Sequence, residues 1–201
     1  MPINLETLRD HDASVVRLSV DLVDGVTAAD LARPTPCAGW DLGDLLAHLA
    51  TQHRGFAAAV EGRGDDPAVW TVTPIGNDPA AEYRQAADLV LKAFSAVDDP
   101  DRPCSLPEIS PDDSLPAVVT IGIHAVDYLI HSWDVAASLG RPFRPDENVT
   151  AALLPLVRSI PDDERRTEPG RAFAPGLPPV EGESPGDRIL RLVGRSPGWR
   201  P

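Results

Sequence analysis

Two histidines and two aspartates lie in one otherwise apolar segment of this chain, HAVDYLIHSWD, at residues 124–134. Asp127 and His131 are four residues apart, so on a helix their side chains point the same way from adjacent turns. A carboxylate and an imidazole placed in this way can bind one divalent cation together. Two other interpretations of the same residues remain open: a buried hydrogen-bond network without a ligand, and the solvent-facing stripe of a surface helix.

The surrounding segment favours a buried position. Residues 114–139 contain no Arg, Lys or Glu, and their only formal charges are Asp127 and Asp134. A surface helix in such an arginine-rich chain would be expected to carry some of these residues. Helical periodicity gathers the polar residues on one stripe edged by Ile and Val, which predicts that the stripe faces an interior cavity: Thr120, His124, Asp127, His131 and Ser138.

A metal site needs at least one more ligand, and it has to come from another helix. The segment at residues 41–62 is predicted to be helical, with Asp41 as its N-cap, and it carries His48 and His53. Periodicity places His53 nearer the centre of the apolar face and His48 at its edge. Spacing alone therefore leaves both histidines open, with a slight preference for His53 as the buried one.

Helical periodicity also predicts the elements that must position these groups. Long helices are expected near residues 5–26, 41–62, 79–97 and 114–139, with shorter helices at 146–159 and 187–193. The Pro- and Gly-rich stretch 161–186 allows a short strand pair around 171–175 and 177–181. The simplest architecture for these helices is mainly α. It is an antiparallel four-helix bundle at residues 1–142, with a C-terminal extension at 143–201 packed on it.

Composition excludes several classes of protein. The chain has 201 residues, a net charge of −13 and a pI near 4.6, which argues against binding to nucleic acid or to an anionic membrane surface. There is no signal-peptide pattern and no apolar run near the ~20 residues of a membrane span. Cys37 and Cys104 are the only cysteines, so no disulfide framework is expected. These observations predict a cytoplasmic protein.

Three segments carry a resemblance to a known family: TPCAGWDLGDLLAHL (35–49), HAVDYLIHSWDVA (124–136) and DRILRLVGRSPGW (187–199). The first two resemble the DinB-like, mycothiol-dependent maleylpyruvate isomerase N-terminal family of actinobacteria, and the third resembles the short tail of an uncharacterised branch. The resemblance implies a DinB-like four-helix bundle with a divalent metal held by His48, Asp127 and His131. It thus selects His48 over His53, and it places Asp127 where that isomerase has the longer glutamate. The C-terminal part is expected to be shorter than the isomerase's own C-terminal domain.

The chemistry that the resemblance implies is metal-assisted activation of a low-molecular-weight thiol such as mycothiol. The thiol would be transferred to a small electrophilic substrate or would promote its isomerisation. Zinc is the first candidate metal and nickel the second. The alternative is a non-catalytic metal- or small-molecule-binding bundle with a stress or regulatory role. His124 and His11 are candidates to support the ligands or line the pocket, no catalytic residue is assigned, and both a monomer and a homodimer are compatible with the sequence. Cys37 and Asp134 receive no functional role at this stage.

Overall fold

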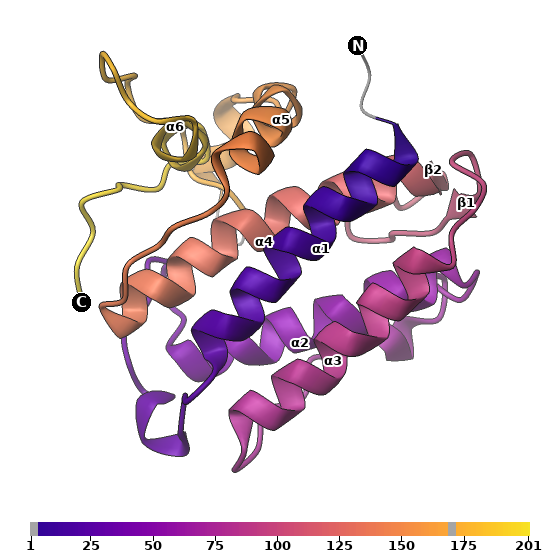
Figure 1. The fold of residues 1–201 in the computed structure, drawn as a ribbon, viewed down its shortest axis with the longest axis horizontal. Coiled ribbons are helices and arrows are strands. Elements are labelled where there is room, and N and C mark those ends of the chain that lie inside the picture. Colours follow the sequence, from indigo (N-terminus) through magenta and orange to yellow (C-terminus); the bar gives the residue numbers. More distant parts are fainter. Residues whose placement is uncertain (1–3, 169–171) are drawn as a thin grey trace.

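The computed structural model describes residues 4–168 and 172–201 and contains a bundle of four long helices with a smaller helical part beside it (Figure 1). The bundle confirms the predicted mainly α, DinB-like class. Its helices are α1 (Leu5–Val23), α2 (Leu42–Val60), α3 (Pro79–Ser95) and α4 (Ala117–Leu139). Within the described residues, no helix is both long enough and apolar enough to span a membrane.

Local capping explains where these helices begin. Asn4 accepts a hydrogen bond from the Thr7 amide at the start of α1. Asp41 and Asp44 form a reciprocal capping box at the start of α2, so two backbone amides that lack helical partners are satisfied. Asp78 caps α3 ahead of a proline in its first turn. These ends agree with the sequence prediction within one residue.

The other ends differ slightly from the prediction for identifiable reasons. α1 stops three residues early because the chain turns at Gly25, which adopts φ 77°. α4 starts three residues late because Leu115 and Pro116 pair with Pro103 and Cys104 as the short antiparallel strands β2 (Leu115–Pro116) and β1 (Pro103–Cys104). It ends as predicted at Gly140, which takes the left-handed conformation at φ 64°.

The bundle pairs α1 with α4 and α2 with α3 most extensively. α1 and α4 run in the same direction. Asp12 in the first half of α1 contacts His124 in the first half of α4, and Arg141 after α4 donates to the carbonyl of Leu22 near the end of α1.

α1 and α3 run in opposite directions. Arg9, near the start of α1, donates to the carbonyl of Val97, just beyond the end of α3. α2 is antiparallel to α4, since His48 early in α2 lies near His131 and His53 further along lies near His124. The bundle therefore joins two parallel pairs that run in opposite directions.

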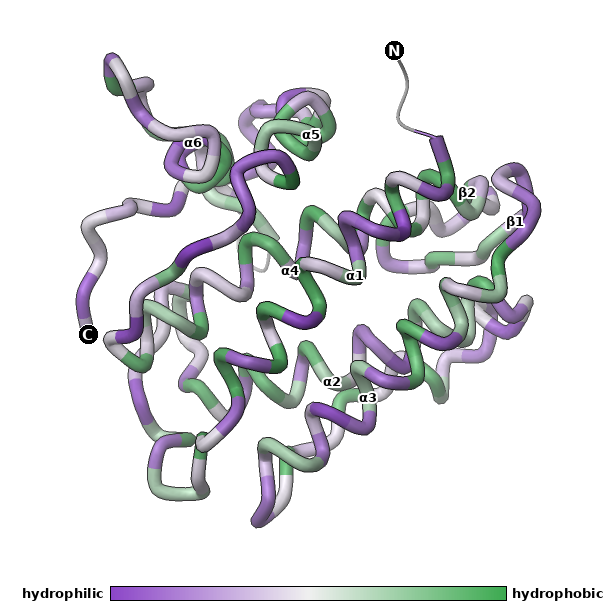
Figure 2. The backbone as a smooth tube through the Cα atoms, viewed as in Figure 1, coloured by the Kyte–Doolittle hydropathy of each residue, from purple (hydrophilic) through white to green (hydrophobic). Residues whose placement is uncertain are grey.

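The C-terminal part adds α5 (Glu147–Arg158) and α6 (Pro185–Leu192) against the α1 and α4 side of the bundle (Figure 1). Both helices carry hydrophilic as well as hydrophobic residues, as amphipathic helices do (Figure 2). Leu153 and Val157 of α5, Ile189 of α6 and Val193 just beyond α6 belong to the same core cluster as buried residues of the bundle.

The prediction of a strand pair near 171–175 and 177–181 is wrong over residues 172–181. Residue 171 lies outside the described residues, and residues 172–181 contain no strand. Pro175, Pro178 and Pro179 lack the amide hydrogen that a ladder requires, which accounts for the irregular backbone.

Candidate metal centre

Two adjacent turns of α4 present Asp127 and His131 toward α2, which presents His48. One potential ligand atom from each of the three residues lies within 4.8 Å of the others. Nε2 of His131 is 3.5 Å from Oδ1 of Asp127, and the rings of His48 and His131 have their centroids 5.7 Å apart. We call these three residues the outer set. Two imidazoles and a carboxylate form a donor set that suits a catalytic zinc ion, which uses three protein ligands and keeps a position open.

The outer set is close to the surface on one side. The side chain of Asp127 is 22% exposed and that of His131 only 8%, while His48 is half-buried. The ring of Trp40, itself partly exposed, packs against His48 with centroids 4.9 Å apart. The outer set is therefore solvent-exposed on the side of Trp40 and Asp127 and buried on the side of His131.

His53 belongs to a different cluster. It is fully buried, as its periodicity predicted, but its Nδ1 lies 3.2 Å from Nε2 of His124. The other ring nitrogen of His124 is 2.6 Å from Oδ1 of Asp12, on α1. The ring of His53 also stacks on Tyr128. His53 therefore lies in a buried chain of polar groups in the bundle core.

This buried chain changes the expected roles of two histidines. Both ring nitrogens of His124 are engaged by Asp12 and His53, and no described contact joins His124 to the outer set. His11 is half-buried and makes no hydrogen bond or ion pair with the described residues. Its neighbour Asp12 is instead buried in the apolar stripe of α1, at 1% exposure. The structure thus does not bring His124 or His11 to the candidate ligands.

A second layer of buried groups lies behind His131. Nδ1 of His131 is 2.9 Å from Oδ2 of Asp134, one turn further along α4. The thiol of Cys37 lies 3.2 Å from the same oxygen. Arg195, beyond α6, donates through Nε and Nη2 to the two oxygens of Asp134 at 3.0 and 3.2 Å.

Sequence reasoning gave Cys37 and Asp134 no role and did not single out Arg195. The spacing of His131 and Asp134, three residues on a helix, was the available signal for a carboxylate that orients the imidazole. No local signal marks Arg195, which is 61 residues from Asp134 in sequence.

These neighbours set the protonation of the candidate ligands. Burial disfavours a charged His131, but the carboxylate of Asp127 and the hydrogen bonds to Asp134 and Cys37 outweigh it and raise its pKa well above 6.5. Burial likewise disfavours a charged Asp134, yet His131 and Arg195 together lower its pKa. The pKa of His48 is lowered, chiefly by burial. At neutral pH His48 is therefore a neutral imidazole, whereas His131 carries a second ring proton.

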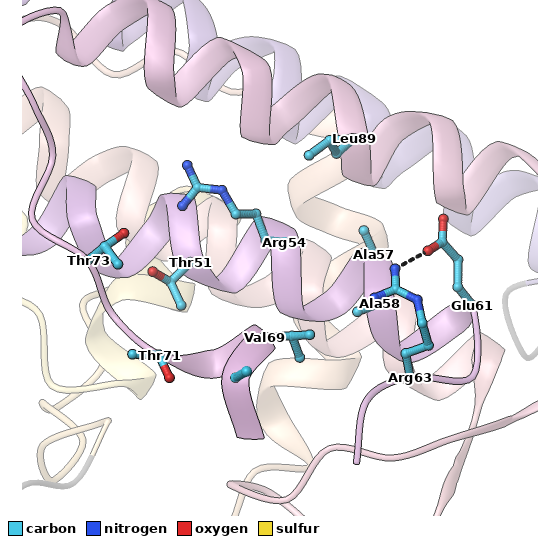
Figure 3. A pocket seen from close by; sticks show the side chains of 11 residues that line it. Thr51, Arg54, Ala57, Ala58, Glu61, Arg63, Val69, Thr71, Thr73 and Leu89 are labelled. Atoms are coloured by element: carbon cyan, nitrogen blue, oxygen red, sulfur yellow. Dashed lines mark hydrogen bonds and ion pairs between the residues drawn. The ribbon is translucent and has the colours of Figure 1, made fainter. Parts of the chain in front are cut away.

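Two hollows elsewhere on the molecule are not part of the outer set. One, of about 500 Å³, lies between α2, α3 and the 3₁₀ turn at Pro67–Trp70, with Arg54, Thr51 and the paired Glu61 and Arg63 among its lining residues (Figure 3). The other, of about 760 Å³, lies between the end of α4 and the C-terminal part. Neither is lined by His48, Asp127 or His131.

Comparison with known proteins agrees with this architecture. The family described as the mycothiol maleylpyruvate isomerase N-terminal domain matches residues 13–136, a range that contains the whole outer set. The chain belongs to this family. Two uncharacterised proteins of Mycobacterium tuberculosis, from strains H37Rv and CDC 1551, are each 28% identical over 181 residues, which cover 87% of this chain and 90% of the relative.

Solved structures of a mycothiol-dependent maleylpyruvate isomerase share the fold. The isomerase matches with a TM-score of 0.65 at 13% identity, and a histidine-to-alanine mutant of it with a TM-score of 0.68 at 12% identity. Each match covers 96% of this chain and 90% of the isomerase chain. The matched region therefore includes most of the C-terminal part of this chain.

Proposed function

We propose that this protein is a divalent-metal-dependent enzyme that activates a low-molecular-weight thiol and directs it to a small electrophilic substrate. The observation that carries the proposal is the convergence of His48, Asp127 and His131 within 4.8 Å at a site that is partly open to solvent. A structural metal would be expected to have four protein ligands and a closed site, whereas three ligands beside an opening are typical of catalysis.

Each residue of the outer set has a distinct part in the proposal. His48 offers a neutral imidazole, since its pKa is lowered. Nδ1 of His131 keeps its proton and donates a hydrogen bond to Asp134. Nε2 is therefore the ring nitrogen that faces Asp127 and His48. Asp127 supplies the negative charge that a hard or borderline cation prefers. A divalent metal bound by these groups would lower the pKa of a thiol or water that it contacts, and so supply a nucleophile at neutral pH.

The family membership supports a thiol of the mycothiol type as the co-substrate. The solved relatives are described as mycothiol-dependent, and the family takes its name from the same thiol. We propose zinc as the first metal and nickel as the second. Transfer of the thiol to an electrophile, or its reversible addition to a double bond with cis–trans isomerisation, would both use the same activated sulfur.

Metal analysis joined to a thiol assay tests this function. Protein purified without an affinity tag should contain close to one equivalent of divalent metal. With mycothiol and maleylpyruvate, or with mycothiol and an alkylating electrophile, it should show metal-dependent turnover that His131→Ala abolishes. Bound metal without turnover of any thiol would favour the non-catalytic metal-binding protein. Absence of metal binding would refute the metal-dependent enzyme and leave only a bundle that binds a small molecule.

A further inference from the structure

His131 lies between two groups of potential metal ligands. Its Nε2 faces the outer set, and its Nδ1 faces an inner set made with Cys37 and Asp134. The ligand atoms of the inner set also lie within 4.8 Å of one another, and all three residues are buried. A thiolate, an imidazole and a carboxylate would suit zinc and, through the sulfur, softer ions.

Arg195 already places a positive charge at the inner set. Its Nη2 is 3.5 Å from the Cys37 sulfur and 3.2 Å from Oδ2 of Asp134, while its Nε reaches Oδ1. The arginine side chain is 9% exposed and that of Asp134 is fully buried. A guanidinium cannot give up its proton under ordinary conditions, so this charge is permanent.

We propose that Arg195 determines whether His131 can bind metal with the outer set or with the inner set. The guanidinium stands in for a cation beside Cys37 and Asp134, so the inner set stays closed to metal. It also holds Asp134 as the acceptor for the Nδ1 proton of His131, which leaves Nε2 as the only nitrogen of that ring available to bind metal. The part of this inference that concerns Nε2 rests on the proposed function; the closure of the inner set does not.

The contacts explain why the closure works. Both oxygens of Asp134 accept hydrogen bonds from Arg195, and one of them also accepts from Cys37 and His131. A metal ion entering the inner set would have to displace these donors, remove the thiol proton, and lie beside the fixed positive charge of the guanidinium. Loss of the guanidinium removes two of these hydrogen bonds and the fixed positive charge, and it leaves a buried carboxylate that needs a new cation.

Cobalt(II) tests the inference, because cobalt bound to a thiolate gives a charge-transfer band that cobalt bound only to nitrogen and oxygen lacks. Wild-type protein should show visible cobalt absorption without the thiolate band, and Cys37→Ser should give the same spectrum. Arg195→Gln should gain the thiolate band, and Arg195→Gln with Cys37→Ser should lose it again. Arg195→Lys, which keeps the charge, should resemble the wild type, and so should Arg200→Gln, an exposed arginine in the same terminal segment.

A second measurement reports on positioning. In Arg195→Gln carrying Cys37→Ser, the affinity of the outer set for cobalt should fall by about 10–100-fold, the usual cost of losing a partner that orients a ligand. Arg195→Met provides a second uncharged variant if the glutamine variant does not fold.

The outcomes separate the two proposals. A thiolate band in the wild type, or any difference between wild type and Cys37→Ser, overturns the closure by Arg195 even if neither Arg195 variant folds. A folded Arg195→Gln without a thiolate band also overturns it. A wild type that binds no cobalt, beside an Arg195→Gln variant with the thiolate band, would refute the outer metal site while supporting the closure.

Discussion

Nδ1 of His131 lies 2.9 Å from Oδ2 of Asp134, while Nε2 of the same ring lies 3.5 Å from Oδ1 of Asp127. A carboxylate can only accept, so the first contact keeps a proton on Nδ1. The carboxylate of Asp127 favours a further proton on Nε2, and a bound metal would displace that proton. This placement between two carboxylates makes His131 the residue on which most of the testable behaviour of the site depends.

The first prediction concerns metal-dependent stability. A metal at a hundredfold excess over its dissociation constant should stabilise the fold by roughly 2.7 kcal/mol, because it binds the folded state only. His131→Ala should abolish this gain, since it removes a ligand of the outer set. Thermal melts with zinc and with chelator measure the effect.

His53→Ala is the matched control for that experiment. It removes a histidine from the same bundle, fully buried but bonded to His124 rather than to the outer set. It should lower the melting temperature in chelator yet keep the full response to zinc. An equal response in wild type and His131→Ala would mean that the polar stripe of α4 is a hydrogen-bond network without metal.

The second prediction is that metal binding releases about one proton at neutral pH. The pKa of His131 is raised well above 6.5, so its Nε2 proton is present at pH 7 and must leave, whereas the lowered pKa of His48 means that ring is already neutral. Metal affinity should therefore fall with decreasing pH, starting above the ordinary histidine range. Calorimetry in buffers of different ionisation enthalpy counts the protons, and a release near zero would contradict the assigned protonation.

Much of the bundle is predictable because its determinants are local. Asp41 and Asp44 cap α2 within four residues of sequence, and Gly140 ends α4 by its own conformational freedom. The pairing of Asp127 with His131 follows from helical spacing alone. Such features need no knowledge of how the helices pack.

The rest of the site depends on contacts between distant segments. Arg195 reaches Asp134 across 61 residues, and Asp12 reaches His124 across 112. Periodicity predicts burial, and it correctly made His53 more buried than His48, but it does not show which histidine faces Asp127 and His131 from another helix. Family resemblance was therefore needed to select His48, and Asp12 could have been noticed only as a charge within the apolar stripe of α1.

The third prediction concerns the acid stability of the buried core. Burial, together with the charges of His124 and Arg54, lowers the pKa of His53 well below 6.5. As the pH is lowered, the unfolded chain therefore binds a proton at His53 at a higher pH than the folded protein does. The free energy of unfolding consequently decreases as the pH falls below ~6.5. The largest slope from this one residue is about 1.4 kcal/mol per pH unit.

His53→Asn should reduce that slope, because the amide can still bond Nε2 of His124 but does not titrate. Urea unfolding between pH 5 and pH 8 in chelator measures the free energy of unfolding for both proteins, with pH 8 as the reference at which His53 is neutral in both states. Parallel pH curves for wild type and variant would show that His53 is not the residue whose protonation opposes folding.

The last prediction compares a buried ion pair with an exposed one. Asp134→Asn should lower the free energy of unfolding by about 3–5 kcal/mol, since it leaves the guanidinium of Arg195 and the imidazolium of His131 buried without their shared counter-ion. Arg84→Ala breaks the pair between Arg84 and Asp24, whose side chains are 49% and 66% exposed, and should cost less than about 1 kcal/mol. Urea unfolding in chelator measures both variants. If both variants lose the same small amount of stability, then the ion pair of Asp134 and Arg195 does not hold the C-terminal segment against α4, and the link between Arg195 and the orientation of His131 fails with it.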